Sequence, residues 1–257
     1  MIGHQDRYAL VTGATTGIGY ELAKLLAKDG KNLIIISWDK NRLEQVKTEI
    51  ENEYGIRVKV LPKDLSDPKA PLEIFSELEK EGIKVEVLVN NAGFGLFGMY
   101  SETDLQKELE MIQVNITSLT HLTKLFLKKM LENKSGRILN VASVVGFLPC
   151  PLFSVYSASK SYVLHFSEAL ANELQGTGVS VTCLCPPPTK TSFWANMEIS
   201  KLAKGKMMNA AKVAEVGYKA LKKEKVIATP GLKGKSLAIL VRIAPRNMLT
   251  KMMRAMA

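Results

Sequence analysis

Short runs of apolar and β-branched residues alternate along the chain with longer segments in which apolar residues recur at helical spacing. The short runs predict seven strands, at 8–11, 33–37, 57–61, 85–90, 137–142, 179–185 and 226–229. The longer segments predict helices at 17–28, 40–53, 71–81, 102–131, 155–175 and 210–223. Because each helix that links two parallel strands must bury its apolar stripe on the sheet, the alternation predicts an α/β fold: a doubly wound, seven-stranded parallel sheet with helices on both faces.

No repeat or linker interrupts this pattern, so we expect one domain over residues 1–257. Residues 186–208 begin with three consecutive prolines and have little strand or helix signal. Long loops of this kind are uncommon unless they bind something. Because this loop follows a strand of the predicted sheet, we interpret it as a substrate lid at the strands' carboxyl ends.

Composition narrows the class of protein. The chain is 46% hydrophobic and 23% charged, which is typical of an ordered globular domain. Its three cysteines are an odd number without Cys-x-x-Cys spacing, and its three histidines are scattered, so we expect neither a disulfide framework nor a metal site. The sequence contains no apolar stretch of spanning length and no recognisable export signal. These features predict a soluble, cytoplasmic protein.

The net charge of +10 is concentrated at one end. Residues 231–257 contain six basic residues and no acidic one, mixed with leucine, isoleucine and methionine. One interpretation is an amphipathic element that contacts membrane lipid or an acyl carrier. The other, which we favour, is a tail that packs beside the substrate pocket or on a neighbouring subunit. No nucleic-acid-binding motif accompanies the charge, so we expect no nucleic-acid partner.

A glycine-rich turn follows the first predicted strand directly. It reads Thr12-Gly-Ala-Thr-Thr-Gly-Ile-Gly19 and leads into a helix. Glycines allow a tight turn and a close approach of a ligand to the backbone, and a helix N-terminus offers free amide groups to a pyrophosphate. The turn alone is a weak signal, because plain strand-to-helix turns also contain glycine.

A possible acid–base group follows later in the chain. Tyr156 and Lys160 are four residues apart in a predicted helix, so both side chains lie on one face. A tyrosine with an ordinary pKa near 10 needs a neighbouring cation to act at neutral pH, and Lys160 is placed to supply it. Ser143, after the fifth strand, can donate a hydrogen bond to a carbonyl oxygen. Together they suit proton transfer at an oxygen whose carbon gains or loses hydride.

Taken in order, the glycine turn, Asn90-Asn-Ala-Gly93, Asn115, Ser143 and Tyr156-Ser-Ala-Ser-Lys160 resemble the short-chain dehydrogenase/reductase family over nearly the whole chain. The resemblance implies a single-domain Rossmann fold and a nicotinamide cofactor. It assigns Tyr156 as general acid or base, Ser143 as the group that orients the carbonyl, and Lys160 as a lysine that lowers the tyrosine pKa and holds the ribose. Asn115 would bend the long helix and support a proton relay.

The resemblance, together with the turn itself, also assigns the cofactor contacts. They are Gly13, Thr15, Thr16, Gly17, Ile18, Gly19, Ser37, Trp38, Asp64, Leu65, Asn91, Ala92, Gly93, Tyr156, Lys160, Thr189 and Thr191. Family members are commonly dimers or tetramers, so we expect a homodimer or homotetramer through 102–131 and 155–175.

The end of the second strand bears on the choice of cofactor. NAD-preferring relatives carry an acid there, whereas this chain has Ser37, with Lys40 and Arg42 nearby, so we favour NADP(H) over NAD(H). Asp39 and the missing arginine at Trp38 point the other way. Trp38 could stack on adenine or pack on the neighbouring helix.

Residues placed around the carbonyl are mainly apolar, with Phe94, Val145, Phe153 and Phe193 as the expected substrate contacts. The sequence therefore predicts an oxidoreductase that transfers hydride between NADP(H) and a hydrophobic ketone or secondary alcohol. Pro187 stands where the family has glycine, and proline forbids a positive φ and lacks an N–H. It motivates an alternative, a cofactor-binding sensor or scaffold with little catalysis.

Overall fold

A computed structural model describes residues 7–194 and 207–256. Its main sheet has seven parallel strands in the order β3-β2-β1-β4-β5-β6-β9. The strands are β1 (Arg7–Thr12), β2 (Asn32–Ser37), β3 (Val58–Pro62), β4 (Lys84–Asn90), β5 (Gly136–Val141), β6 (Val179–Leu184) and β9 (Ile227–Ala228). The chain winds outward from β1 on one side and from β4 on the other, so a crevice forms between them at the carboxyl edge. The predicted doubly wound fold is confirmed.

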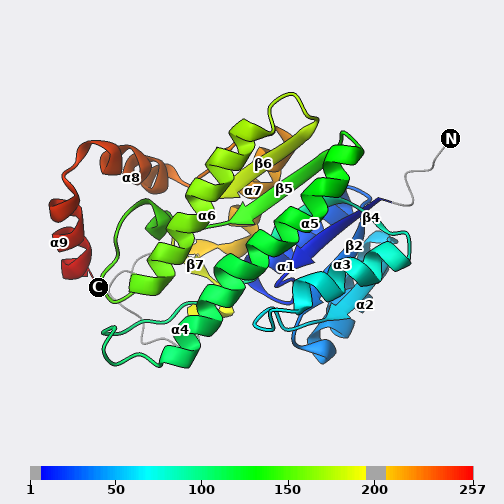
Figure 1. Cartoon of the computed structure of the whole chain (residues 1–257), viewed down its shortest axis with the longest axis horizontal. Coiled ribbons are helices and arrows are strands. Elements are labelled where there is room, and N and C mark those ends of the chain that lie inside the picture. The colour runs from blue at the N-terminus through cyan, green and yellow to red at the C-terminus, as the bar shows by residue number, and fades with distance from the viewer. Residues whose placement is uncertain (1–6, 195–206, 257) are drawn as a thin grey trace.

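Helices cover both faces of the sheet (Figure 1). One face packs against α1 (Gly17–Lys28), α2 (Lys40–Tyr54) and α7 (Ala210–Lys222). The other packs against α3 (Ala70–Lys80), α5 (Leu119–Glu132) and α6 (Ser154–Glu173). Strand β2 shows why the sequence requires both layers: Leu33 and Ile35 are buried in the first core, and Ile34 and Ile36 in the second.

The helix predicted at 102–131 is wrong as one continuous element. Helix α4 (Leu105–Ile112) begins only after Asp104, whose carboxylate accepts a hydrogen bond from the Lys107 N–H at 2.8 Å as an N-cap. A π-helical segment (Gln113–Ser118) then separates α4 from α5. A π segment widens the helix and turns its side chains relative to the residues that follow, and such segments are frequent at functional sites.

The predicted lid contains more regular structure than a loop. A short ladder pairs β7 (Thr189–Lys190) with β8 (Met208–Asn209), and a 3₁₀ turn spans Ser192–Trp194. Residues 195–206 of the predicted lid lie outside the described residues. The ladder brings the two ends of the lid segment together at the carboxyl edge of the sheet.

The basic tail forms two helices, α8 (Leu232–Ile243) and α9 (Arg246–Met256), which the apolar pattern did not predict as helices. Pro245, which lies between them, has no N–H to continue a helix. In Figure 1 these two helices stand at one end of the molecule, away from the N-terminus. No helix within the described ranges combines the length and the apolar character needed to cross a membrane.

Candidate active site

A cleft of about 780 Å³ opens at the carboxyl edge of the sheet. It brings together most of the predicted residues: Gly13, Thr15, Thr16, Gly17, Ile18, Ser37, Trp38, Asp64, Leu65, Asn91, Ala92, Gly93, Phe94, Ser143, Val145, Phe153, Tyr156, Lys160, Thr189, Thr191 and Phe193. Two predicted residues, Gly19 and Asn115, do not line it. Both act from behind the cleft wall, as their contacts show.

The glycine turn forms one end of the cleft. Gly13 and Gly17 have φ values of +63° and +59°, a region that side chains other than glycine rarely occupy. A Cβ at Gly17 would lie 2.8 Å from the Cγ2 of Thr191 across the cleft. Helix α1 has no side-chain cap, whereas α2, α4 and α7 are capped by Asp or Asn. Its first amide groups are therefore available to a phosphate, as a dinucleotide cofactor requires.

Thr12 and Asn91 hold this turn in place. The Thr12 hydroxyl accepts hydrogen bonds from the N–H groups of Asn91 and Ala92, both at 3.0 Å. The Asn91 amide donates to the carbonyls of Thr12 and Gly13, also at 3.0 Å. A Cβ at Gly19 would lie 2.3 Å from that amide nitrogen, so Gly19 is required for packing. Thr12 had no predicted role, although it opens the glycine motif.

The three acid–base residues meet at the centre of the cleft. Ser143 follows β5, while Tyr156 and Lys160 lie on α6, so two neighbouring elements position them. The Lys160 ammonium donates to the Val141 carbonyl at 3.0 Å and lies 5.8 Å from the centre of the Tyr156 ring. The Ser143 hydroxyl accepts from the Val145 N–H at 3.3 Å and lies near enough to Tyr156 to lower the pKa of its phenol.

Burial disfavours the charged forms of both residues. It raises the pKa of Tyr156 above its ordinary value, and the hydrogen bond from Ser143 lowers it by less. Burial lowers the pKa of Lys160 to about 8. The Lys160 ammonium is bonded to the neutral Val141 carbonyl, and its expected effect of lowering the tyrosine pKa stays a prediction. Tyr156 is thus held as a neutral acid, and Lys160 titrates near neutrality.

Asn115 lies in the π-helical segment and is buried. Its side chain accepts from the Phe94 N–H at 3.2 Å and donates to the Phe94 carbonyl at 3.0 Å and to the Ser159 hydroxyl at 3.1 Å. Ser159 in turn donates to the Tyr156 carbonyl at 2.7 Å. Asn115 therefore ties the loop after β4 to the helix that carries Tyr156. Ser159 was missed; its position three residues after Tyr156 on the same helix is the only signal for it.

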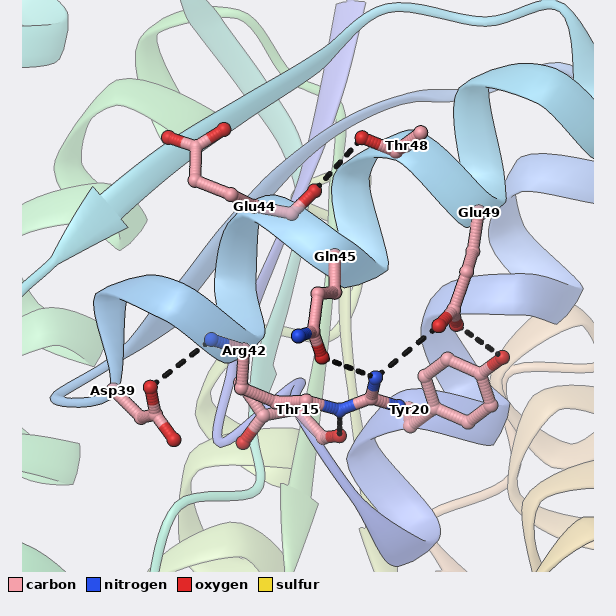
Figure 2. A network of polar contacts seen from close by, with 8 residues as sticks. All are labelled: Thr15, Tyr20, Asp39, Arg42, Glu44, Gln45, Thr48 and Glu49. Atoms are coloured by element: carbon pink, nitrogen blue, oxygen red, sulfur yellow. Dashed lines mark hydrogen bonds and ion pairs between the residues drawn. The ribbon is translucent and has the colours of Figure 1, made fainter.

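The end of β2 forms the other polar corner of the cleft, and Figure 2 shows the network around it. Asp39 caps α2 by accepting from the Arg42 N–H at 3.0 Å. The Arg42 guanidinium reaches back to the glycine turn, donating to the Thr15 carbonyl at 3.4 Å and to Glu49 at 3.1 Å. Trp38 is 76% exposed and lines the cleft, so it does not pack on the neighbouring helix.

An aromatic wall surrounds the Tyr156 ring. Its centre lies 5.6 Å from that of Phe153 and 5.3 Å from that of Phe193. Phe153 belongs to a buried apolar cluster with Leu148, Cys150 and Met253 of α9, against which Val145 also packs. The substrate side is therefore apolar, and the tail supplies part of it.

The loop after β6 accommodates Pro187 without a positive φ at any residue from 186 to 191. The Pro187 carbonyl accepts from the Thr189 hydroxyl at 2.7 Å. The lid and the glycine turn meet where the hydroxyls of Thr16 and Ser192 lie 3.0 Å apart. Proline at this position is therefore compatible with the arrangement of the cleft.

Comparison with known proteins agrees with this geometry. The short chain dehydrogenase family matches residues 7–201. A very-long-chain 3-oxoacyl-CoA reductase of Anas platyrhynchos is 38% identical over 205 residues, covering 77% of this chain and 62% of the relative. A 17-beta-hydroxysteroid dehydrogenase type 3 of Rattus norvegicus is 35% identical over 202 residues, covering 77% and 65%.

This chain therefore spans less than two thirds of the length of these two relatives. A solved short-chain dehydrogenase from Sphingobium yanoikuyae, in complex with NADPH, superposes with a TM-score of 0.82 at 27% identity, covering 93% of this chain and 96% of that one. By the family match and by the turn, serine, tyrosine and lysine assembled in its cleft, the chain belongs to the short chain dehydrogenase family, whose members are oxidoreductases that use a nicotinamide cofactor.

Proposed function

We propose that the protein is an NADP(H)-dependent oxidoreductase that reduces a hydrophobic ketone, or oxidises the corresponding secondary alcohol. The observation that carries the proposal is the grouping of Ser143, Tyr156 and Lys160 beside an apolar wall, at one end of a cleft whose other end is a helix N-terminus without a side-chain cap. The bound nicotinamide supplies the hydride.

In the reductive direction, Ser143 and Tyr156 position the carbonyl oxygen by hydrogen bonds. As the carbon accepts hydride, negative charge develops on that oxygen, and the Tyr156 hydroxyl donates its proton to it. The Lys160 ammonium, in the same buried pocket, stabilises the phenolate that remains. Asn115 and Ser159 keep the helix that carries Tyr156 in register with the loop after β4.

The preference for NADP(H) is supported at the end of β2. Ser37 carries no charge that would repel a 2′-phosphate, and its hydroxyl lies 3.4 Å from that of Thr15. The Asp39 carboxylate is occupied as the cap of α2. Arg42 places a cation against the Thr15 carbonyl, beside the expected ribose position.

Two substrate classes are named for the relatives, 3-oxoacyl-CoA and hydroxysteroid. The apolar wall suits either one. We propose the 3-oxoacyl thioester, because the cations of the tail are compatible with a substrate that carries phosphates. A homodimer or homotetramer and a cytoplasmic location remain predictions.

The test is a parallel fluorescence titration with NADPH and NADH, followed by ketone reduction with the cofactor that binds more tightly. We expect tighter binding of NADPH, a roughly tenfold loss of NADPH affinity in Arg42→Gln, and unchanged NADH affinity. The matched variant Lys47→Gln removes one cation from the same helix, α2, at a position with no expected cofactor contact, and should change neither. Preference for NADH would refute the cofactor assignment, and binding without hydride transfer across a ketone panel would favour the scaffold alternative.

A further inference from the structure

The tail helix α9 is built into the wall of the active site. Leu249 is 2% and Met253 4% exposed, and Met253 shares the buried cluster of Phe153. Phe153 in turn contacts the Tyr156 ring, so α9 belongs to the apolar cluster that packs against the proton donor. The family match covers residues 7–201, and this helix follows it in the chain.

The outward side of α9 carries cations that form no ion pair among the described residues. Arg246, Lys251 and Arg254 are exposed, and residues 231–257 contain no acidic residue. Within the described residues these three make no ion pair, whereas cations elsewhere do, such as Lys59 with Glu77 at 3.0 Å. The Arg254 guanidinium instead contacts the sulfur of Met99, in the loop after β4, at 3.7 Å. A thioether is a weak acceptor and leaves the guanidinium charge uncompensated.

We propose that the exposed cations of α9, Lys251 and Arg254 above all, bind the phosphates of coenzyme A when its 3-oxoacyl thioester occupies the cleft. The inference rests on the proposed ketone reduction. The inference places the 3-oxo group at Tyr156 and the pantetheine arm along Phe153, which lines the cleft and shares an apolar cluster with Met253 of α9. The phosphates would then reach the exposed Arg254 on the same helix. Guanidinium groups bind phosphate through paired, charge-assisted hydrogen bonds.

The same cations could contact an anionic lipid surface, but α9 is poorly suited to enter a bilayer. Its apolar residues Leu249 and Met253 face inward and are buried, and Met248 is its one large apolar side chain more than half exposed among the described residues. Membrane-binding amphipathic helices bury their apolar face in the lipid boundary. A soluble polyanion fits an outward face that presents cations and, among the described residues, a single methionine that is more than half exposed.

The test compares two thioesters of one acyl chain, 3-oxododecanoyl-CoA and its phosphate-free N-acetylcysteamine analogue. Wild-type protein should show a lower KM for the coenzyme A thioester, and added salt should raise that KM alone. The double variant Lys251→Gln/Arg254→Gln should raise it roughly three- to thirtyfold and leave the analogue unchanged. The control, Lys223→Gln/Lys225→Gln, removes two exposed cations at the opposite edge of the sheet and should behave as wild type.

Calorimetry with free coenzyme A separates this inference from the proposed function. If the wild-type protein reduces neither thioester, the proposed substrate class is wrong. In that case, coenzyme A binding that is lost only in the α9 double variant still supports the phosphate site. Equal KM values for both thioesters in wild type overturn the inference and leave ketone reduction standing. It is also overturned if the double variant abolishes sedimentation with phosphatidylglycerol vesicles but leaves coenzyme A binding unchanged.

Discussion

Different kinds of interaction hold the two ends of the cleft together. At the cofactor end, backbone and short polar side chains hold one another by directional hydrogen bonds, as Thr12 and Asn91 do around the glycine turn. At the substrate end, non-directional apolar packing joins Phe153 to Met253, more than ninety residues later in the chain. Hydrogen-bond geometry restricts which residues can stand at a position, whereas apolar contacts tolerate substitution of similar volume. Short sequence motifs therefore identify the residues of the cofactor end, whereas they do not identify those of the substrate end.

The largest effect is expected at Tyr156, where the two ends meet. Tyr156→Phe removes the proton donor but keeps the ring against Phe153 and Phe193. We expect kcat for ketone reduction to fall roughly 100- to 10,000-fold. NADPH affinity, measured by fluorescence titration, should stay within about twofold of wild type, because the substitution keeps the ring and removes one hydroxyl among many expected cofactor contacts. A variant with nearly normal turnover would show that another group donates the proton.

A glycine substitution tests the cofactor end of the cleft, which directional hydrogen bonds hold together. Gly17→Ala places a Cβ 2.8 Å from Thr191 at a φ of +59°, so the turn or the lid must shift. We expect a loss of NADPH affinity of about tenfold or more, since a distorted turn misaligns the free amides of α1. Gly30→Ala is the matched control, because Gly30 has a φ of +76° with nothing within 4 Å of its added Cβ. Equal losses of NADPH affinity in both variants would contradict the assignment of Gly17.

The pH dependence of ketone reduction tests the roles of the buried Tyr156 and Lys160. The raised pKa of Tyr156 keeps its hydroxyl protonated, whereas Lys160, with a pKa of about 8, loses its charge as the pH rises through that value. Reduction should therefore be constant below about pH 8 and fall about tenfold per unit above it, because the phenolate loses its stabilising cation. Single-turnover rates between pH 6 and 10 provide the measurement. A rate that stays flat to pH 10 would mean that the lysine charge is not required.

The smallest effect on kinetics is expected at the apolar, substrate end of the cleft. Met253→Ala leaves a cavity beside Phe153, so KM for a hydrophobic ketone should rise about three- to tenfold, while NADPH affinity stays unchanged. Met248→Ala, on the same helix but 53% exposed, should leave both unchanged. If the two variants behaved alike, α9 would not belong to the substrate wall.

Much of the fold follows from local pattern. The seven strands of the main sheet were predicted within two residues at each end, because β-branched runs such as 33–37 are buried on both faces and have no other stable placement. The break at 113–118 was not predicted. It depends on the contacts that Asn115 makes with Phe94 and Ser159, distant in the chain, and no local periodicity records them.

The sequence by itself determined the doubly wound sheet, the glycine turn and the identities of Ser143, Tyr156 and Lys160, because those features rest on local periodicity and on fixed spacing along single elements. Only the tertiary structure decided that burial raises the pKa of Tyr156, that Arg42 turns toward Thr15, and that α9 contributes to the apolar wall. Each of these depends on how far apart, and how far from water, side chains from separate elements come to lie, and both distance and burial arise only when the chain packs.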